Sequence, residues 1–214
     1  MSRPSGTADS KHAPVRVAGL LLAAGAGRRM GGPKALVEVD GEPLVRRGIR
    51  LLTDGGCDPV VVVVGACADD VRALSLGTTV VEADAWATGM GASLRAGLAA
   101  LGATDAAACV VALVDQPLVT PTAVQRLRAA HDTGATAAVA CYDGRPRNPV
   151  LLDRSVWADV AAAAQGDEGA RVWLRAHPGQ VVPVDCTDAG SADDLDTPQD
   201  LAALDIPARR KAAR

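Results

Sequence analysis

Residues 20–34 read Leu-Leu-Leu-Ala-Ala-Gly-Ala-Gly-Arg-Arg-Met-Gly-Gly-Pro-Lys, and the predicted architecture follows from them. The aliphatic run 17–22 predicts a strand that delivers a loop to the carboxyl edge of a sheet, where α/β proteins bind ligands. Glycines such as Gly25 and Gly27 can take positive φ and let backbone N–H groups approach a bulky anion. Three cations surround the same loop: Arg28, Arg29 and Lys34. The stretch therefore predicts a triphosphate-binding loop.

Two common phosphate-binding motifs do not match this loop. The Walker pattern requires Ser or Thr after its lysine, whereas Ala35 follows Lys34. A dinucleotide fingerprint requires a third glycine, which is replaced by Met30, and Pro33 interrupts the helix that should follow. An ordinary glycine-rich turn with solvated arginines remains an alternative for the loop taken alone.

Length and composition predict one α/β domain of 214 residues, with no nucleic-acid partner. Hydrophobic residues make up 49% of the chain, yet there is no Phe and only one Tyr, so Ala, Val and Leu must build the core. The net charge of −3 provides no basic field for nucleic acid, and the lack of aromatics argues against single-strand stacking. We expect a disordered leader over 1–14, a single domain over 15–206 and a basic tail over 207–214.

The cysteines and the apolar runs indicate a cytoplasmic protein. The five cysteines are odd in number and lack Cys-x-x-Cys spacing, so we expect buried thiols rather than disulfides or zinc ligands. No apolar run reaches about 18 residues, so no membrane span is predicted. The leader also lacks the apolar segment of a signal peptide.

Strand and helix signals alternate through the chain. Residues 60–64 are five consecutive valines, which is typical of a strand covered on both faces in a parallel sheet. A hairpin is predicted around Asp40-Gly41. Further strands are expected at 79–82, 109–114, 137–141, 150–152 and 181–184. Helices are expected at 43–52, 69–76, 92–101, 121–131, 155–164, 169–176 and 197–204. The pattern predicts a Rossmann-like three-layer α/β sandwich with a mostly parallel sheet and right-handed crossovers.

One acidic residue is a candidate metal ligand from its position, and another lies at a predicted helix start. Asp115 follows the strand expected to end at 114, and a carboxylate at this edge can hold Mg²⁺ together with substrate phosphates. An alternative is that Asp115 caps the next helix. Asp196-Thr197-Pro198 has the pattern of a helix start, with Thr or Asp before a first-turn proline. The histidines cannot supply a metal site, because His131 and His177 are expected on the surface without partners and His12 lies in the leader.

Residues 86–97 contain two glycines ahead of a predicted helix. Gly89 and Gly91 would allow the backbone to lie against a flat ligand, and Ser93 could hydrogen-bond a base or ribose. Taken alone, the segment is equally typical of a tight loop.

These motifs together, in their order over about 17–204, resemble the MobA-like NTP transferases. The opening run is similar to the family motif Leu-Ala-Ala-Gly-x-Gly-x-Arg-Met-Gly-x-x-Lys. Its Leu-Ala-Ala-Gly start, with the later Gly-Met-Gly-x-Ser-Leu, resembles the molybdenum cofactor cytidylyltransferases more than the guanylyltransferases, which usually have Leu-Ala-Gly-Gly. The resemblance implies Mg²⁺-dependent transfer of CMP from CTP to molybdopterin, with release of pyrophosphate. A transient contact with a molybdoenzyme or its maturation factor is also expected.

The resemblance also implies roles for individual residues. Catalytic roles fall on Lys34, Arg29 and Asp115. Metal ligands are Asp115 and Asp196, with Asp194 as the alternative to Asp196. The nucleotide is expected to contact Leu22, Ala23, Ala24, Gly25, Ala26, Gly27, Arg28, Arg29, Lys34, Gly89, Gly91, Ser93 and Asp115.

The acceptor segment departs from the family pattern. Relatives commonly have Gly-His-Pro where this chain has Arg145-Pro146-Arg147-Asn148-Pro149. The candidates for binding the acceptor are Arg145, Arg147 and Asn148, although two loop arginines are as often simply solvated. GTP in place of CTP, a sugar or alcohol phosphate acceptor, and a non-catalytic nucleotide-binding protein that delivers a cofactor remain alternatives.

Overall fold

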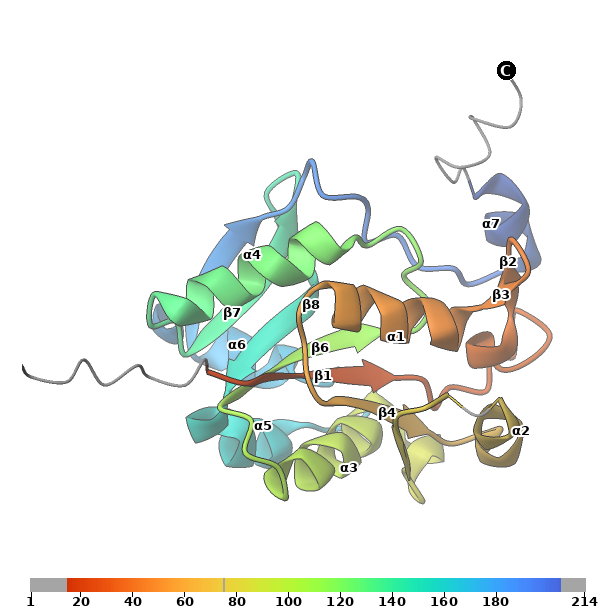
Figure 1. Ribbon diagram of the computed structural model, residues 1–214, viewed down its shortest axis with the longest axis horizontal. Helices are drawn as coiled ribbons and strands as arrows, with labels where there is room; N and C mark the ends of the chain where they lie inside the picture. Colours follow the sequence, from red (N-terminus) through yellow and green to blue (C-terminus); the bar gives the residue numbers. More distant parts are fainter. Residues whose placement is uncertain (1–14, 75, 205–214) are drawn as a thin grey trace, which may run out of the picture.

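The computed structural model describes residues 15–74 and 76–204, which form a central sheet between two layers of helices (Figure 1). The seven strands lie in the order β5-β4-β1-β6-β8-β7-β9. Their bounds are β1 Val17–Leu22, β4 Val60–Val64, β5 Thr79–Glu82, β6 Ala108–Leu113, β7 Ala137–Tyr142, β8 Arg145–Asp153 and β9 Val181–Asp185. Strands β2 (Glu38–Val39) and β3 (Glu42–Pro43) form the small hairpin predicted around Asp40-Gly41. The predicted leader and basic tail lie outside the described residues.

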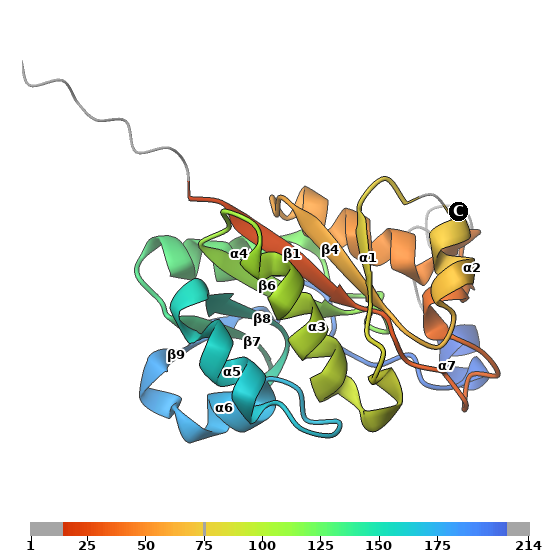
Figure 2. The ribbon, with the colours of Figure 1, turned by 90° about the horizontal axis from the view of Figure 1, so that it is seen from below.

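Helices cover both faces of the sheet. Helices α1 (Leu44–Asp54) and α4 (Pro121–Asp132) lie on one face. Helices α3 (Met90–Gly102), α5 (Trp157–Ala163) and α6 (Arg171–Ala176) lie on the other, as the view from below shows (Figure 2). Two short helices, α2 (Ala68–Ala73) and α7 (Pro198–Ala203), lie at the same end of the molecule as the glycine loop. The predicted three-layer α/β sandwich is confirmed.

The central strand β1 explains how the layers are held together. All six of its residues are buried, and it pairs in parallel with β4 on one side and β6 on the other. A Cβ on Gly48 of α1 would lie 2.7 Å from the Leu21 side chain, and a Cβ on Gly97 of α3 would lie 2.4 Å from that of Leu20. The two glycines therefore let a helix approach β1 closely from each face, which fixes the position of the loop that β1 delivers.

The expected alternation of strand and helix is wrong at β7 and β8. These strands form a hairpin in which Asp143 (φ 50°) and Gly144 (φ 73°) make the turn. Asp-Gly readily takes the left-handed conformations that a two-residue hairpin turn requires. Strand β8 runs antiparallel to both β6 and β7, and it begins at Arg145 rather than near the expected residue 150. The segment interpreted as an acceptor loop is therefore part of the sheet.

The histidine prediction is wrong for His131. Its side chain, at the end of α4, is only 10% exposed, and Nε2 lies 2.9 Å from Asp153 Oδ2. The same carboxylate accepts hydrogen bonds from the backbone N–H (2.9 Å) and hydroxyl (2.6 Å) of Ser155. His177 also has a partner, because its Nδ1 lies 2.9 Å from the carbonyl oxygen of Trp173. The two rings serve the packing of helix ends.

The Asp153 carboxylate makes stability depend on pH. Burial alone would raise its pKa, but the hydrogen bonds from Ser155 and His131 outweigh burial and lower the pKa below the ordinary value. Its contribution is therefore present above the unfolded pKa of about 3.9 and is lost as the pH falls through the folded pKa. We expect Asp153→Asn to lower Tm by about 2–4 °C at pH 7, and by progressively less below pH ~4.

Thermal melts of both proteins between pH 2.5 and pH 7 measure this difference. Asp132→Asn is the matched control, because it removes an exposed acid from the end of α4, the helix that carries His131. A difference between wild type and Asp153→Asn that stays constant across the pH range would contradict the role of the charge.

The cysteines agree with their prediction. All five are free and buried in the structure. Burial raises the pKa of the Cys57 thiol to about 12, so this side chain stays protonated at neutral pH. Within the described residues, no helix is both long and apolar enough to cross a membrane.

Candidate active site

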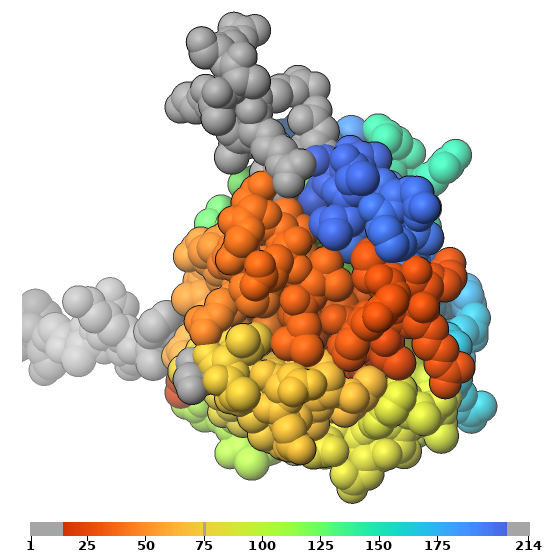
Figure 3. All heavy atoms as spheres, turned by 90° about the vertical axis from the view of Figure 1, so that its right-hand side faces the viewer, coloured from red at the N-terminus to blue at the C-terminus, as the bar shows by residue number. Residues whose placement is uncertain are grey.

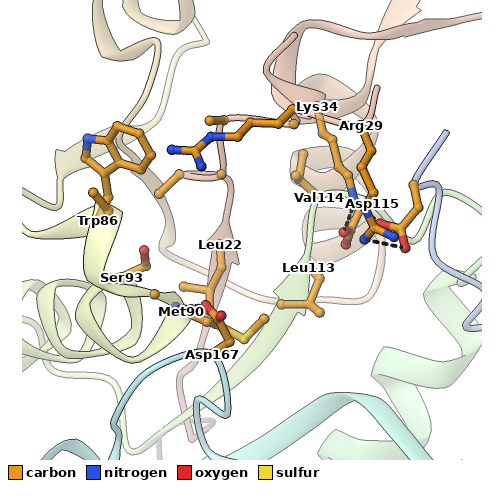
Figure 4. Close-up of a pocket in the computed structure, with 18 residues that line it drawn as sticks. Leu22, Arg29, Lys34, Trp86, Met90, Ser93, Leu113, Val114, Asp115 and Asp167 are labelled. Carbon is orange, nitrogen blue, oxygen red and sulfur yellow. Dashed lines mark hydrogen bonds and ion pairs between the residues drawn. The ribbon is translucent and has the colours of Figure 1, made fainter. Parts of the chain in front are cut away.

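A cleft of about 420 Å³ lies where β1 and β6, neighbouring parallel strands, reach their carboxyl ends (Figure 4). It is the position at which an α/β sheet is expected to bind a ligand. Its walls combine the glycine loop, the start of α3 and three carboxylates. The lining residues are Leu22, Ala24, Gly25, Ala26, Gly27, Arg28, Arg29, Lys34, Trp86, Ala87, Gly89, Met90, Ser93, Leu113, Val114, Asp115, Asp167 and Asp196.

The glycine loop closes on itself through Gly27. The carbonyl oxygen of Gly27 accepts hydrogen bonds from the backbone N–H groups of Met30 (2.9 Å) and Gly32 (3.2 Å). Gly27 has φ +57°, and a Cβ there would lie 1.9 Å from the carbonyl oxygen of Gly32. Gly25 is different, since it is not among the residues of positive φ and an added Cβ would have no neighbour within 4 Å. Of these two glycines, only Gly27 is required by the conformation of the turn, in which Gly31 also has a positive φ of +87°.

Lys34 connects the loop to two acidic segments. Its Nζ donates hydrogen bonds to Asp115 Oδ2 at 2.7 Å and to Asp196 Oδ1 at 2.6 Å. The second oxygen of Asp196 lies 3.0 Å from Arg29 Nη2. Dashed lines in Figure 4 mark these contacts. In the space-filling view, the glycine loop (red) lies beside the segment that carries Asp196 and α7 (blue) (Figure 3).

The charges of this cluster stabilise one another. Burial would lower the pKa of Lys34, but the hydrogen bonds to Asp115 and Asp196 outweigh burial and raise it above the ordinary value. The hydrogen bond from Lys34 is the main cause of a lowered pKa for Asp196. Because the Lys34 side chain is only 16% exposed, solvent screens these contacts weakly. The cluster thus places the Lys34 ammonium between the side chains of Asp115 and Asp196.

Asp194, the alternative to Asp196, has a different environment. The buried side chain of Gln116 donates to Asp194 Oδ1 at 2.9 Å and to the carbonyl oxygen of Ala192 at 3.1 Å. Burial raises the pKa of Asp194. Asp194 does not line the cleft, whereas Asp196 does. The structure therefore brings Asp196 to Lys34 and keeps Asp194 beside Gln116.

The start of α7 fixes the direction of Asp196. Thr197 is the N-cap residue, and it forms a capping box with Asp200. Asp200 Oδ2 also accepts from the backbone N–H of Asp196 at 3.0 Å. The backbone N–H of Leu195 donates to the carbonyl oxygen of Asp115 at 2.8 Å, which ties this segment to the end of β6. The predicted helix start is confirmed and holds Asp196 in the cleft.

The donor set fits a divalent cation that arrives with a substrate. No group of three or more His, Cys, Asp or Glu side chains able to hold a metal occurs in the described part of the chain. Asp115 and Asp196, however, both contact one cationic nitrogen, so two carboxylates face a single cation position. Mg²⁺ commonly takes one or two carboxylates and completes its shell with phosphate oxygens and waters. The two residues suit that arrangement and do not form a complete metal cage.

The opposite end of the cleft contains residues that the sequence analysis did not assign. Trp86 and Met90 stand beside the predicted Ser93, whose side chain is buried at 4% exposure with no hydrogen-bond partner within the described residues. Both residues lie within the segment 86–97, so the same motif that predicted Ser93 could have predicted them as ligand contacts. Asp167 comes from the loop between α5 and α6, and no motif marked it. Leu113 and Val114 complete the wall.

Two of the predicted nucleotide contacts lie behind the cleft surface. Ala23 belongs to the core, where its backbone N–H pairs with Val63, and it does not line the cleft. Gly91 is buried, and a Cβ there would lie 2.9 Å from the backbone of Ala164. Gly89 (φ +116°) lines the cleft, but a Cβ there would lie 2.4 Å from Gly166. The glycines therefore permit the approach of a neighbouring loop.

The predicted acceptor residues lie beside the cleft. Arg147 and Asn148 line a second hollow of about 560 Å³ with an apolar floor, whose rim also contains Arg171 and Arg175. A narrow cavity of about 20 Å³ lies between the two hollows, since Leu22 and Met90 of the cleft and Asn148 and Arg171 of the second hollow all line it. Arg145 is exposed at the start of β8 and lines neither hollow.

The sequence model of the MobA-like NTP transferase domain matches residues 19–181, which is most of the chain. The chain belongs to this family. A curated MobA-like relative, nicotine blue oxidoreductase of Paenarthrobacter nicotinovorans, is 41% identical over 88% of this chain and 96% of its own length. The molybdenum cofactor guanylyltransferase of Rhodobacter capsulatus is 32% identical over 92% of this chain and 100% of its own. The MobA-like chain described here is thus a nucleotidyltransferase, as the resemblance predicted.

A solved structure agrees with the fold. A Mycobacterium tuberculosis H37Rv protein in complex with manganese superposes with a TM-score of 0.69 at 29% identity. The match covers 89% of this chain and 98% of that one.

Proposed function

We propose that this MobA-like enzyme transfers a nucleoside monophosphate from CTP or GTP to the phosphate of molybdopterin and releases pyrophosphate. The observation that carries the proposal is the contact of Lys34 with Asp115 and Asp196 at the end of the glycine loop. The sequence motifs favour CTP, and the guanylyltransferase relatives favour GTP. The cytoplasmic location and the contact with a molybdoenzyme stay predictions.

The cleft supplies binding and charge. The backbone of 25–27, with Arg28, Arg29 and Lys34, would hold the triphosphate, since all of these line one cavity. Mg²⁺, when bound, would be held by Asp115 and Asp196 and would neutralise charge on the phosphates. Lys34 and Arg29 would then face the β- and γ-phosphates and stabilise the leaving pyrophosphate.

The transfer needs no general base from the protein. A phosphate monoester has a second pKa of about 6, so the acceptor is mostly dianionic at neutral pH. One of its oxygens forms the new bond to the α-phosphorus, and the bond from that phosphorus to the bridging oxygen breaks. The electron pair leaves with pyrophosphate. The task of the site is to hold the two anions in line. Among the residues that the structure describes, no histidine lines the cleft, which is consistent with this chemistry.

The second hollow is our proposed site for the acceptor. Its apolar floor suits a flat ring, and its arginines suit a phosphate. Arg147 and Arg171 form no ion pair within the described residues, whereas Arg175 pairs with Glu168 at 2.6 Å. Arg147 and Arg171 are therefore the cations available for an anion. Asn148 lines the narrow cavity between the hollows and would contact a ligand that reaches the cleft from there.

A second candidate activity is oxidoreduction at the same cleft. It is favoured by the 41% identity to a relative named as an oxidoreductase. Such an activity would use a bound nucleotide cofactor and would release no pyrophosphate.

Pyrophosphate release tests the proposal. We expect the enzyme to release pyrophosphate and form a dinucleotide when it is incubated with Mg²⁺, molybdopterin and CTP or GTP, and to do neither without acceptor. A sugar phosphate in place of molybdopterin tests the alternative acceptor class. Nucleotide binding without pyrophosphate in any mixture would contradict the transferase and favour a cofactor-delivery role. If NADH or NADPH is added to these mixtures and becomes oxidised, the result would favour the oxidoreductase activity.

A further inference from the structure

Asp167 lies in the cleft at the end opposite to Lys34 (Figure 4). It comes from residues 164–170, a loop between α5 and α6, whereas the other acids of the cleft follow β6 or precede α7. Its side chain lies beside Met90 and Leu22, below Ser93. This end of the cleft would receive the heterocycle of a ligand whose phosphates bind at Lys34.

The loop that carries Asp167 is held against the start of α3. The backbone N–H of Gly91 donates to the carbonyl oxygen of Gly166 at 2.8 Å, and the Arg95 guanidinium donates to the carbonyl oxygen of Ala164. A Cβ on Gly89 would lie 2.7 Å from Asp167 Oδ1. The glycines of the Gly-Met-Gly segment are thus required for this contact, and the carboxylate has a fixed place in the wall.

The Asp167 carboxylate has unused acceptor capacity. Its one hydrogen bond is a long one of 3.4 Å, from the backbone N–H of Met90 to Oδ1. Oδ2 has no partner, and no cation pairs with this acid in the part of the chain that the structure describes. A carboxylate accepts through two oxygens and can receive two parallel N–H donors. A ligand with two adjacent N–H groups would match it.

We propose that Asp167 binds the edge of a 2-amino-4-oxopyrimidine ring, in which a ring N–H stands beside an exocyclic amine. Guanine and pterin share this edge. Cytosine presents one amine beside two acceptors, so a carboxylate facing that edge would meet a lone pair. The inference rests on the proposed function, because that function supplies both a nucleotide and a pterin acceptor.

Two places in the site allow two sources of the ring. The guanine of GTP would lie between Asp167, Ser93 and Trp86, all of which line the cleft. The pterin of the acceptor would lie on the side of the cleft that faces the second hollow, where Glu168, the next residue, lines the narrow cavity between the two. The chemistry is the same in both cases, and binding measurements separate them.

The test uses Asp167→Asn and titrations with Mg²⁺–GTP, Mg²⁺–CTP and 6-hydroxymethylpterin. Asparagine keeps the shape but presents one donor and one acceptor, which match cytosine rather than guanine or pterin. Loss of a charged hydrogen-bond acceptor is expected to weaken the 2-amino-4-oxo ligand about tenfold to a hundredfold, and to leave CTP unchanged or tighter. Asp159→Asn, an exposed acid on α5, is the control for net charge.

The outcomes separate this inference from the proposed function. Weakening of GTP alone assigns Asp167 to the nucleotide base, and weakening of the pterin alone assigns it to the acceptor. If neither ligand weakens more than in Asp159→Asn, the role of Asp167 is overturned while nucleotide binding stands. If the wild type binds neither triphosphate, the proposed function fails, and the pterin titration still decides the role of Asp167.

Discussion

Lys34→Ala is expected to lower the rate of pyrophosphate release by about 10²–10³-fold while the protein stays folded. Lys34 Nζ contacts Asp115 and Asp196 at 2.7 and 2.6 Å, so its loss leaves two carboxylates facing each other and removes a cation from the phosphate end of the cleft. Lys34 lies outside the core clusters of the sheet, so we expect the melting profile to remain cooperative. Initial rates with saturating Mg²⁺, nucleotide and acceptor measure the effect.

Arg50→Ala is the matched control for the loss of a positive charge. Arg50 is exposed on α1 and pairs with Glu42, away from the cleft. It should retain nearly the wild-type rate. A Lys34→Ala protein as active as Arg50→Ala would refute the proposed role of Lys34.

Gly27→Ala is expected to lower kcat/KM about a hundredfold, since misplacing reacting groups by about 1 Å has effects of this size. The added Cβ would lie 1.9 Å from the carbonyl oxygen of Gly32, and φ of +57° is strained for alanine. The turn must open to relieve the contact, and its N–H groups then lose their positions. The variant keeps every charged side chain of the site.

Gly32→Ala is the control within the same loop. Gly32 has no positive φ, and an added Cβ there would meet nothing within 4 Å. We expect its kcat/KM and its nucleotide affinity to stay close to the wild-type values. Equal losses in the two variants would indicate general sensitivity of the loop rather than a turn that depends on Gly27.

The sequence predicted the sheet and one end of the site because those features are local. Five valines at 60–64 and the aliphatic run before Gly25 identify buried parallel strands. The position of Asp115 in the site can be predicted because it lies just after the end of β6. Asp196 needed the family resemblance, since 162 positions separate it from Lys34 and only the fold joins them. Asp143-Gly144 is a local hairpin signal, and with it the strand predicted at 150–152 extends back to Arg145.

Other features could not be read from any local pattern. Asp167 reaches the cleft because its loop packs on Gly89 and Gly91, a contact between residues far apart in the chain. His131 is buried because β8 brings Asp153 to the end of α4, whereas the helix end alone suggested an exposed ring. In both cases tertiary packing decides the environment of a polar side chain.

The reversed direction of β8 has a consequence for how this family can change substrates. An antiparallel strand begins at the edge where its parallel neighbours finish, so Arg147 and Asn148 reach the second hollow from within the sheet. Arg145 to Arg147 pair with β7 alone, so an inserted residue before Arg147 would shift this register, whereas an exchanged side chain would not. We therefore expect acceptor diversity among relatives to arise by substitution at 145–148, with the length of the segment kept constant.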